Sequence, residues 1–416
     1  MPSKDRGRHL SLSRRDLLAG TAGIAALGAM PAIVRAQEGP IKIGFPVPLT
    51  GLFATEAQDQ VRAAQLAVKE FNDGGGFSGR MAELLVRDDK LNPGEAATRT
   101  LELIEKDRVH FICGTLSAAV QLSVNNVTKA RGVIYVSISQ SDKISEASDA
   151  SEFTFHEAVN PYLMSGAVAR YAIPKYGKRA VCLVSDYAYG HENIRGFQKA
   201  GEPLGLQILA DLRHPLGQTD YSTFLPRIQS LRPDILFLAN FGADLVNSVK
   251  QAADAGLKDR MKIICPTLLY TSRIAGGDDA FEGVAGATPY YWGIEDTVPS
   301  AKAFNDKFKA AYEGRYPSDY GAMGYSGIRV LLEGVKNAKS TDAKPVIAAM
   351  RELKYDYYKG PQYYRGCDQQ SVQSVFVIEA KTKGKKNQYD VFSVAGTEAA
   401  DEKRLRSCEE LGHKAT

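Results

Sequence analysis

The chain has 416 residues, 44% hydrophobic and 24% charged, which is typical of a globular protein long enough for two domains. Of its 52 lysines and arginines and 48 acidic residues, residues 1–36 carry six and two, so the remainder has 46 of each and no net charge. The excess of basic over acidic residues lies entirely in this leading segment, and we therefore expect no nucleic-acid partner.

The leading segment has the pattern of an export signal. A basic stretch precedes Arg14 and Arg15, an apolar run covers residues 17–34, and Ala36 ends a sequence suited to cleavage. A transmembrane anchor is the alternative, but the apolar run is short, rich in glycine and interrupted by Pro31. We expect a twin-arginine type signal, cut before Gln37, and a periplasmic protein.

From residue 41 onward, short β-rich apolar runs alternate with amphipathic helical stretches. The first series predicts strands at 41–47, 82–89, 110–114 and 133–139, with helices near 56–72, 94–107 and 118–131. After 153–159 a second series predicts strands at 179–186, 206–212, 234–242 and 262–269, with helices near 161–176, 190–204, 221–231 and 243–255. This repeated order indicates two α/β lobes with parallel sheets.

The last third of the chain has a different pattern. Residues 283–292 are followed by three helical stretches at 299–314, 321–338 and 343–353, with no long strand between them. We expect these helices to return and cover the first lobe. Two further strands are predicted at 372–380 and 388–396, joined by a lysine-rich, solvated turn.

The five cysteines fall into two groups. Cys113, Cys182 and Cys265 lie in apolar strand-like runs, where buried, inert thiols are expected. Cys367 and Cys408 lie in polar surroundings near the end of the chain, where an oxidising compartment favours a disulfide between them.

No motif in the sequence indicates catalysis. The glycines at 74–79 satisfy the spacing of a dinucleotide fingerprint, but they follow a helix and precede a strand, so a turn is expected. His191 and Glu192 begin a zinc-protease pair whose second histidine is replaced by Arg195. We therefore expect neither an enzyme nor a protein with a metal or cofactor.

Binding chemistry is better represented, in the loops that follow the predicted strands. Ligands of such sheets sit beyond the carboxyl ends of the strands, near helix N-termini. The loops of the first lobe offer mainly serine and threonine, which suit a carboxylate, and those of the second offer tyrosine and phenylalanine, which suit an apolar or planar body. Each loop alone is also typical of helix capping and turns. Their recurrence after successive strands indicates a binding cleft.

Several segments together resemble one family, and their order along the chain is specific. The segments are IKIGFPVPLTG, FNDGGGFSGR, LLVRDDKLNPGEAATRTLELI, FICGTLS, VSDYAYGHENIRGF, the stretch from TDYSTFLPRI to KQAADAGL, and YPSDYGAMGYSGIRVLLEGVKNA. Nearly the whole chain after residue 36 resembles the branched-chain amino-acid-type, type I periplasmic binding proteins of ABC transporters. The resemblance implies two Rossmann-like lobes and three hinge crossings, near 158–161, 286–292 and 360–365. Residues 40–158 with 290–360 then form lobe 1, and 159–289 with 361–416 form lobe 2 and the C-terminal tail.

The resemblance also implies the pocket positions. They fall on Ser117, Ala118, Ser139 and Ser141 in the first lobe, and on Tyr189, Phe241 and Thr267 in the second. Phe53, Tyr291 and Trp292 are further candidates to pack the ligand body. In the amino-acid binders an acidic side chain at the position of Thr267 holds the α-ammonium, and a hydroxyl does not replace it, since a desolvated ammonium needs a counter-charge. Glu56 could supply one from the first lobe, but the simpler interpretation is a solvent-facing charge at a helix N-terminus.

These expectations define a function. We expect a monomeric protein that traps a small carboxylate or amide, such as an aromatic acid, between its lobes and presents it to an ABC permease and ATPase at the inner membrane. Two alternatives remain open: binding of branched-chain amino acids, and a ligand-sensing module of the same fold.

Overall fold

A computed structural model describes residues 39–414. The predicted export signal lies outside the described residues. Within residues 39–414, no helix has the length and apolar character needed to cross a membrane.

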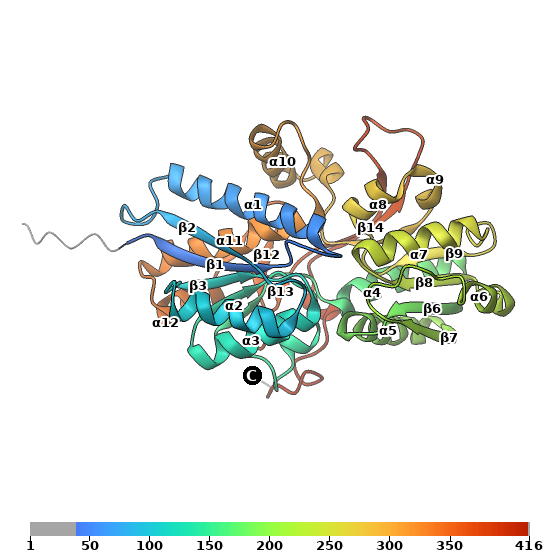
Figure 1. Cartoon of the computed structure of the whole chain (residues 1–416), viewed down its shortest axis with the longest axis horizontal. Coiled ribbons are helices and arrows are strands. Elements are labelled where there is room, and N and C mark those ends of the chain that lie inside the picture. The colour runs from blue at the N-terminus through green and yellow to red at the C-terminus, as the bar shows by residue number, and fades with distance from the viewer. Residues whose placement is uncertain (1–38, 415–416) are drawn as a thin grey trace, which may run out of the picture. The chain divides into compact units, whose positions relative to one another are not determined.

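The first lobe is built on a five-stranded parallel sheet with the order β2-β1-β3-β4-β5. Its strands are β1 (Ile41–Val47), β2 (Ala82–Asp88), β3 (Phe111–Gly114), β4 (Ile134–Ser137) and β5 (Thr154–His156), and its crossover helices are α1 (Ala54–Asp73), α2 (Pro93–Glu105) and α3 (Ala118–Arg131). The helices bury their apolar faces on the sheet, in blue and teal in Figure 1. Gly114, with φ 134°, ends β3 in a conformation that a side chain would strain, and a Cβ there would lie 2.9 Å from the Pro46 carbonyl oxygen.

The second lobe is built on a seven-stranded sheet with the order β15-β14-β10-β9-β8-β6-β7. Its strands are β6 (Arg179–Ser185), β7 (Gln207–His214), β8 (Ile235–Ala239), β9 (Lys262–Cys265), β10 (Ala285–Thr288), β14 (Val375–Ala380) and β15 (Phe392–Glu398). Its helices are α4 (Pro161–Tyr176), α5 (Ala188–Gly201), α6 (Leu225–Leu231), α7 (Gly242–Asp254), α8 (Tyr270–Gly276) and α9 (Asp278–Phe281). β14 and β15 are antiparallel additions to a parallel sheet.

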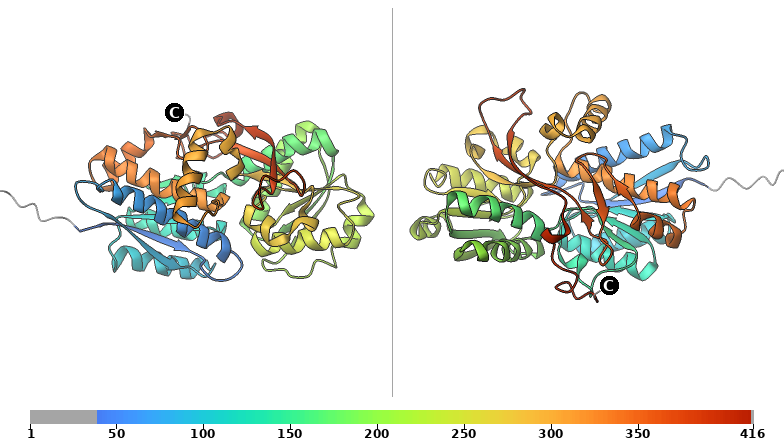
Figure 2. Two further views of the ribbon diagram at one scale, coloured as in Figure 1. Left: turned by 90° about the horizontal axis from the view of Figure 1, so that it is seen from above. Right: turned by 180° about the vertical axis from the view of Figure 1, so that it is seen from behind.

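Three late helices return to the first lobe, as the sequence predicts. They are α10 (Pro299–Ala311), α11 (Asp319–Ala338) and α12 (Ala343–Arg351). α11 packs along α1, and the two views of Figure 2 show this orange helix beside the blue one. At Gly324 the helices approach so closely that a Cβ would lie 2.5 Å from the Gln60 carbonyl oxygen, so a glycine is needed there.

A small third sheet corrects the predicted position of the last hinge crossing. Its strands are β11 (Lys354–Tyr355), β12 (Gln362–Tyr364) and β13 (Ser371–Val372). Gln370 forms a bridge with His156 at the end of β5, so this sheet belongs to the first lobe and the chain crosses between β13 and β14. The prediction of a crossing at 360–365 was wrong because strands of two or three residues, rich in polar side chains, give no period-2 signal.

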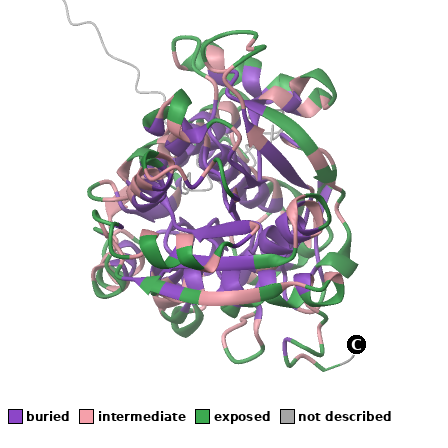
Figure 3. Ribbon diagram, turned by 90° about the vertical axis from the view of Figure 1, so that its right-hand side faces the viewer, coloured by how far each residue is buried: buried purple, intermediate pink, exposed green. Residues whose placement is uncertain are grey.

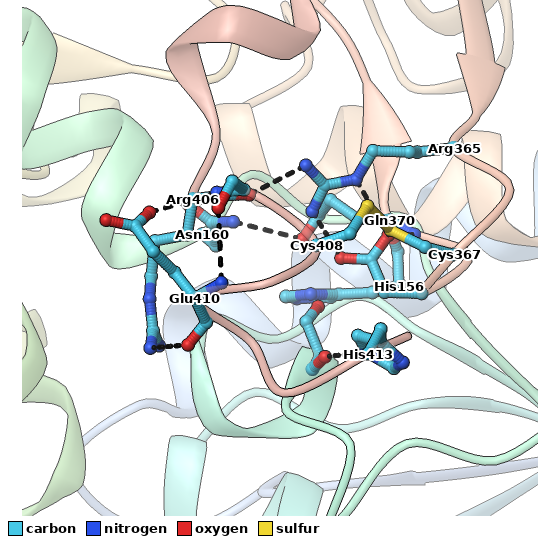
Figure 4. Close-up of polar contacts among 12 residues, drawn as sticks. His156, Asn160, Arg365, Cys367, Gln370, Arg406, Cys408, Glu410 and His413 are labelled. Carbon is cyan, nitrogen blue, oxygen red and sulfur yellow. Dashed lines mark hydrogen bonds and ion pairs between the residues drawn. A yellow bond between two sulfur atoms is a disulfide. The ribbon is translucent and has the colours of Figure 1, made fainter. Parts of the chain in front are cut away.

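The C-terminal tail, predicted to belong with the second lobe, lies mainly against the first lobe. The Ala147 amide donates to the Leu411 carbonyl at 2.8 Å, and His413 Nε2 lies 2.8 Å from the Ser145 carbonyl oxygen. The predicted disulfide between Cys367 and Cys408 is present, with the two Cα atoms 6.2 Å apart, and it holds the tail to the loop after β12 (Figure 4). The tail also reaches the second lobe, where Glu410 lies 3.7 Å from Lys199 on α5.

The core is continuous through both sheets. Figure 3 shows buried strands in purple inside a shell whose outward helix faces are green. Cys113, Cys182 and Cys265 are buried and free, as their apolar context predicts, and burial raises the pKa of each thiol. These thiols contribute packing, not reactivity.

Candidate functional site

The predicted pocket residues lie where strands end and helices begin. Phe53, Ser117 and Phe241 immediately precede α1, α3 and α7, and Ala118 and Tyr189 stand in the first turns of α3 and α5. All five are buried. Each follows a parallel strand, so the two lobes present the carboxyl ends of their sheets with helix N-termini beside them, an arrangement that favours an anionic group.

An aromatic cluster spans the two lobes. The ring centroids of Phe53 and Phe241 are 4.7 Å apart, and the rings meet edge to face. Phe241 also meets Tyr189 at 6.0 Å and Tyr320 at 5.1 Å, both edge to face, and Tyr187 stacks on Tyr189 at 5.9 Å. Tyr320, which comes from α11 of the first lobe, was not predicted. The cluster packs buried rings of the two lobes against one another.

The three predicted serines differ in how their hydroxyls are used. Ser139 is fully buried, and its hydroxyl has no hydrogen-bond partner. The Ser141 hydroxyl donates to Glu192 Oε1 at 3.0 Å and accepts from the Lys143 amide at 3.2 Å. The Ser117 side chain caps no backbone amide of α3. Of these three side chains, only that of Ser139 is a buried hydroxyl without a partner, an arrangement that is costly in free energy.

Thr267 makes a contact between the lobes. Its hydroxyl donates to Gln140 Oε1 at 3.2 Å, and both residues are buried. The amide nitrogen of Gln140 and the hydroxyl of Tyr189 have no hydrogen-bond partner. Burial raises the pKa of Tyr189, and the nearby Thr267 hydroxyl opposes that rise. Gln140 carries no signal in the sequence beyond its place between Ser139 and Ser141.

Glu56 does not face solvent, so that interpretation of the sequence was wrong. Its side chain is 3% exposed, and its Oε1 accepts a hydrogen bond from Thr271 Oγ1 of α8 at 2.6 Å. Burial raises its pKa. Asp319, at the start of α11, is a second buried carboxyl of the first lobe and accepts from the Tyr270 amide at 3.3 Å. Burial raises the Asp319 pKa to about 7. The first turn of α1 was assumed to be exposed, but α8 of the other lobe covers it.

Glu192 of the second lobe also contacts the first lobe. It projects from α5, and its carboxyl accepts from the Asp142 amide at 2.7 Å as well as from Ser141. Burial first, and the neighbouring Asp142 carboxyl second, raise the pKa of Glu192 to about 8. Its neighbour His191 pairs with Asp186 at 2.6 Å. Residues 39–414 bring no three histidine, cysteine or acidic side chains together as a metal site.

This raised pKa has a measurable consequence for stability. Between about pH 4.5 and 8, Glu192 is ionised in the unfolded chain but still protonated in the folded protein, so stability falls as pH rises through that window. We expect Glu192→Gln, which stays neutral, to lose less unfolding free energy than the wild type between pH 5 and 8, measured by urea denaturation. Glu202→Gln, on an exposed turn, is the control and should keep the wild-type slope. Parallel slopes for wild type and Glu192→Gln would contradict this assignment.

Tyr291 and Trp292 lie in a separate aromatic group. The Tyr291 hydroxyl donates to Asp390 at 3.0 Å, and Trp292 stacks on Tyr316 with ring centroids 3.9 Å apart. Within residues 39–414, neither ring contacts the aromatic cluster around Phe241. The aromatic residues that gather around the ends of the sheets are instead Phe53, Tyr187, Tyr189, Phe241 and Tyr320.

Comparisons with known proteins agree with this architecture. The sequence profile described as "Periplasmic binding protein" matches residues 40–386. The chain is 23% identical to the leucine-, isoleucine-, valine-, threonine- and alanine-binding protein of Pseudomonas aeruginosa, over 75% of this chain and 82% of that protein. Among solved structures, a periplasmic binding protein from Burkholderia mallei is 26% identical, with a TM-score of 0.83 over 89% of this chain and 97% of the other. A solute-binding protein of an ABC transporter from R. palustris, in complex with benzoate, is 23% identical, with a TM-score of 0.77 over 87% and 97%.

The match to the family covers most of the chain, and two lobes with mostly parallel sheets are the fold that the resemblance implies. The chain belongs to the periplasmic binding protein family, in its type I, branched-chain amino-acid class of ABC-transporter substrate-binding proteins.

Proposed function

We propose that the protein, exported and cleaved before Gln37, captures a small acid without an α-ammonium group, aromatic acids above all, between its lobes. It works as a monomer and presents the trapped acid to an ABC permease and ATPase. The carboxylate lies on the first-lobe side near Ser139, and the body of the ligand packs on Phe241 and Tyr189. Contacts across the cleft, such as Ser141 with Glu192, hold the lobes together around it.

One observation carries the proposal: two buried hydroxyls without partners, on Ser139 and Tyr189, accompany an aromatic cluster shared by both lobes. A buried hydroxyl without a partner costs about 1 to 3 kcal/mol, and a ligand carboxylate would supply the missing acceptor. The rings suit a planar body. The solved R. palustris protein in complex with benzoate supports the same ligand class for this fold.

Binding of an aliphatic amino acid is the second candidate, favoured by the buried carboxyls of Glu56 and Asp319 and by the named Pseudomonas relative. An ammonium needs an ionised partner with free lone pairs. Burial raises the pKa of both groups, and each already accepts a hydrogen bond from the second lobe. These features favour the acid over the amino acid.

Isothermal titration calorimetry on residues 37–416 tests the proposal. We expect benzoate or 4-hydroxybenzoate to bind at least about tenfold more tightly than leucine or valine, because the ammonium is desolvated without a full counter-charge. Ser139→Ala should weaken benzoate binding by about tenfold, Tyr189→Ala should weaken packing of the ring, and Ser141→Ala should weaken binding by disturbing Glu192. Ser230→Ala, whose hydroxyl bonds only within exposed α6, is the matched control.

Tight binding of leucine with both benzoates inert would overturn the ligand class and support amino-acid binding instead. Equal affinities of Ser139→Ala and Ser230→Ala for benzoate would remove Ser139 from the site.

A further inference from the structure

Gln140 was not among the predicted pocket residues, but its side-chain amide lies at a contact between the two lobes. It is 2% exposed and follows β4 in the first lobe, between two serines. Its Oε1 accepts a hydrogen bond from Thr267 Oγ1 of the second lobe at 3.2 Å. The Nε2 end has no partner. A carboxamide NH₂ group only donates hydrogen bonds, so it requires an acceptor.

The unpartnered donors around Gln140 come from both lobes. Ser139, the preceding residue, has a buried hydroxyl without a partner, and Tyr189 of the second lobe has another. The nearby acids do not satisfy them: Glu192 accepts from Ser141 and Asp142, and Glu56 accepts from Thr271. Closing the lobes on these donors without a ligand leaves three buried polar groups unpaired, which is costly.

Three donors are more than one carboxylate bound at Ser139 needs. A ligand that satisfies them all carries a carboxylate and a second oxygen with free lone pairs, such as a keto or hydroxyl group next to it. A ligand ammonium at this place meets the amide hydrogens of Gln140 and is rejected, since both groups only donate.

We propose that Gln140 is a specificity-determining residue that selects acids bearing a second acceptor oxygen, 2-oxo acids above all, over the amino acids of the same carbon skeleton. This inference rests on the proposed function, whose acid-binding cleft it refines. Thr267 acts as a positioning residue, because it holds the amide by its oxygen and leaves the nitrogen for the ligand.

Two matched ligand series test the inference by calorimetry. One is phenylpyruvate, 3-phenylpropanoate and phenylalanine; the other is 4-methyl-2-oxopentanoate, 4-methylpentanoate and leucine. In at least one series we expect the 2-oxo acid to bind about tenfold more tightly than the unsubstituted acid, and the amino acid to bind weakest.

Three variants distinguish the contribution of the Gln140 amide nitrogen to binding from that of the hydrogen bond between Thr267 and Gln140. Gln140→Leu should abolish the tenfold advantage of the 2-oxo acid over the unsubstituted acid. The unsubstituted acid should bind to Gln140→Leu and to Thr267→Val with affinities that differ by no more than about threefold. Thr267→Val removes the same bond between the lobes but keeps the amide, so it should weaken both acids and retain part of the advantage of the 2-oxo acid. Gln140→Glu supplies an acceptor and should raise the affinity for the amino acid relative to the 2-oxo acid.

Equal affinities of the 2-oxo and unsubstituted acids for the wild-type protein would overturn the inference and leave acid binding intact. So would an unchanged ratio in Gln140→Leu. If benzoates and all four acids of the two series fail to bind while leucine binds, the proposed function fails and the inference with it.

Discussion

Replacing Glu157 with leucine is expected to destabilise the protein by about 3 to 5 kcal/mol, the largest loss we expect from a single substitution. Glu157 is fully buried just after β5, where the chain leaves the first lobe. Its carboxyl accepts hydrogen bonds from the hydroxyls of Ser326 at 2.5 Å and Tyr364 at 2.6 Å, and from that of Tyr355. Leucine would leave the hydroxyls of Ser326 on α11 and Tyr364 on β12 unpaired, and that of Tyr355 on β11 with Ser371 alone.

Urea denaturation of graded variants isolates this effect. Glu157→Gln keeps one carbonyl acceptor and should lose less, and Ser326→Ala removes a single donor and should cost about 1 kcal/mol. A Glu157→Leu protein within about 1 kcal/mol of wild type would show that the hydroxyls find other partners and that the network adds little.

Removing the disulfide should give the second largest loss. Cys367→Ser with Cys408→Ser opens a cross-link spanning 41 residues, which on the chain-entropy model lowers the unfolding free energy by about 3 to 4 kcal/mol. Amide hydrogens of the tail should also exchange faster, because only scattered contacts, such as that of Ala147 with Leu411, then hold the tail to the lobe. Thermal unfolding and hydrogen exchange measure the two effects.

A reducing agent provides the matched control. Treatment of the wild-type protein should reproduce the loss, and the double serine variant should not respond. A melting temperature that is the same for oxidised and reduced protein would contradict a stabilising role for this bond.

Much of the fold could be predicted because long periodic segments carry strong signals. The helix predicted at 321–338 appears as α11 at Asp319–Ala338, and the strand at 41–47 is β1. The segment at 354–372 could not be placed. Its three short strands are defined by pairing with one another and by a bridge to His156, about 200 residues earlier, and such partners leave no local pattern.

The site was less predictable than the fold. Loops at strand ends pointed to Ser139, Tyr189 and Phe241, because parallel strands bring such loops to one edge. Gln140 and Glu56 were missed or misjudged because their burial depends on the second lobe, through Thr267 and Thr271. Contacts made only when two lobes meet cannot be read from the neighbours of a residue in sequence.

The return of α11 to α1 sets the order in which the protein can assemble. The first lobe needs residues from both ends of the chain, since α1 begins at Ala54, α11 begins at Asp319 and the tail contact is made by Leu411. During synthesis the strands around β1 are made early. Some 260 more residues must be synthesised before α11, the helix that covers α1, can form. Pairings so distant in sequence slow folding, because a long loop must close before they stabilise anything. A nascent chain that stopped before residue 319 would therefore expose the apolar face of α1, so the first lobe to be translated is the last to be completed.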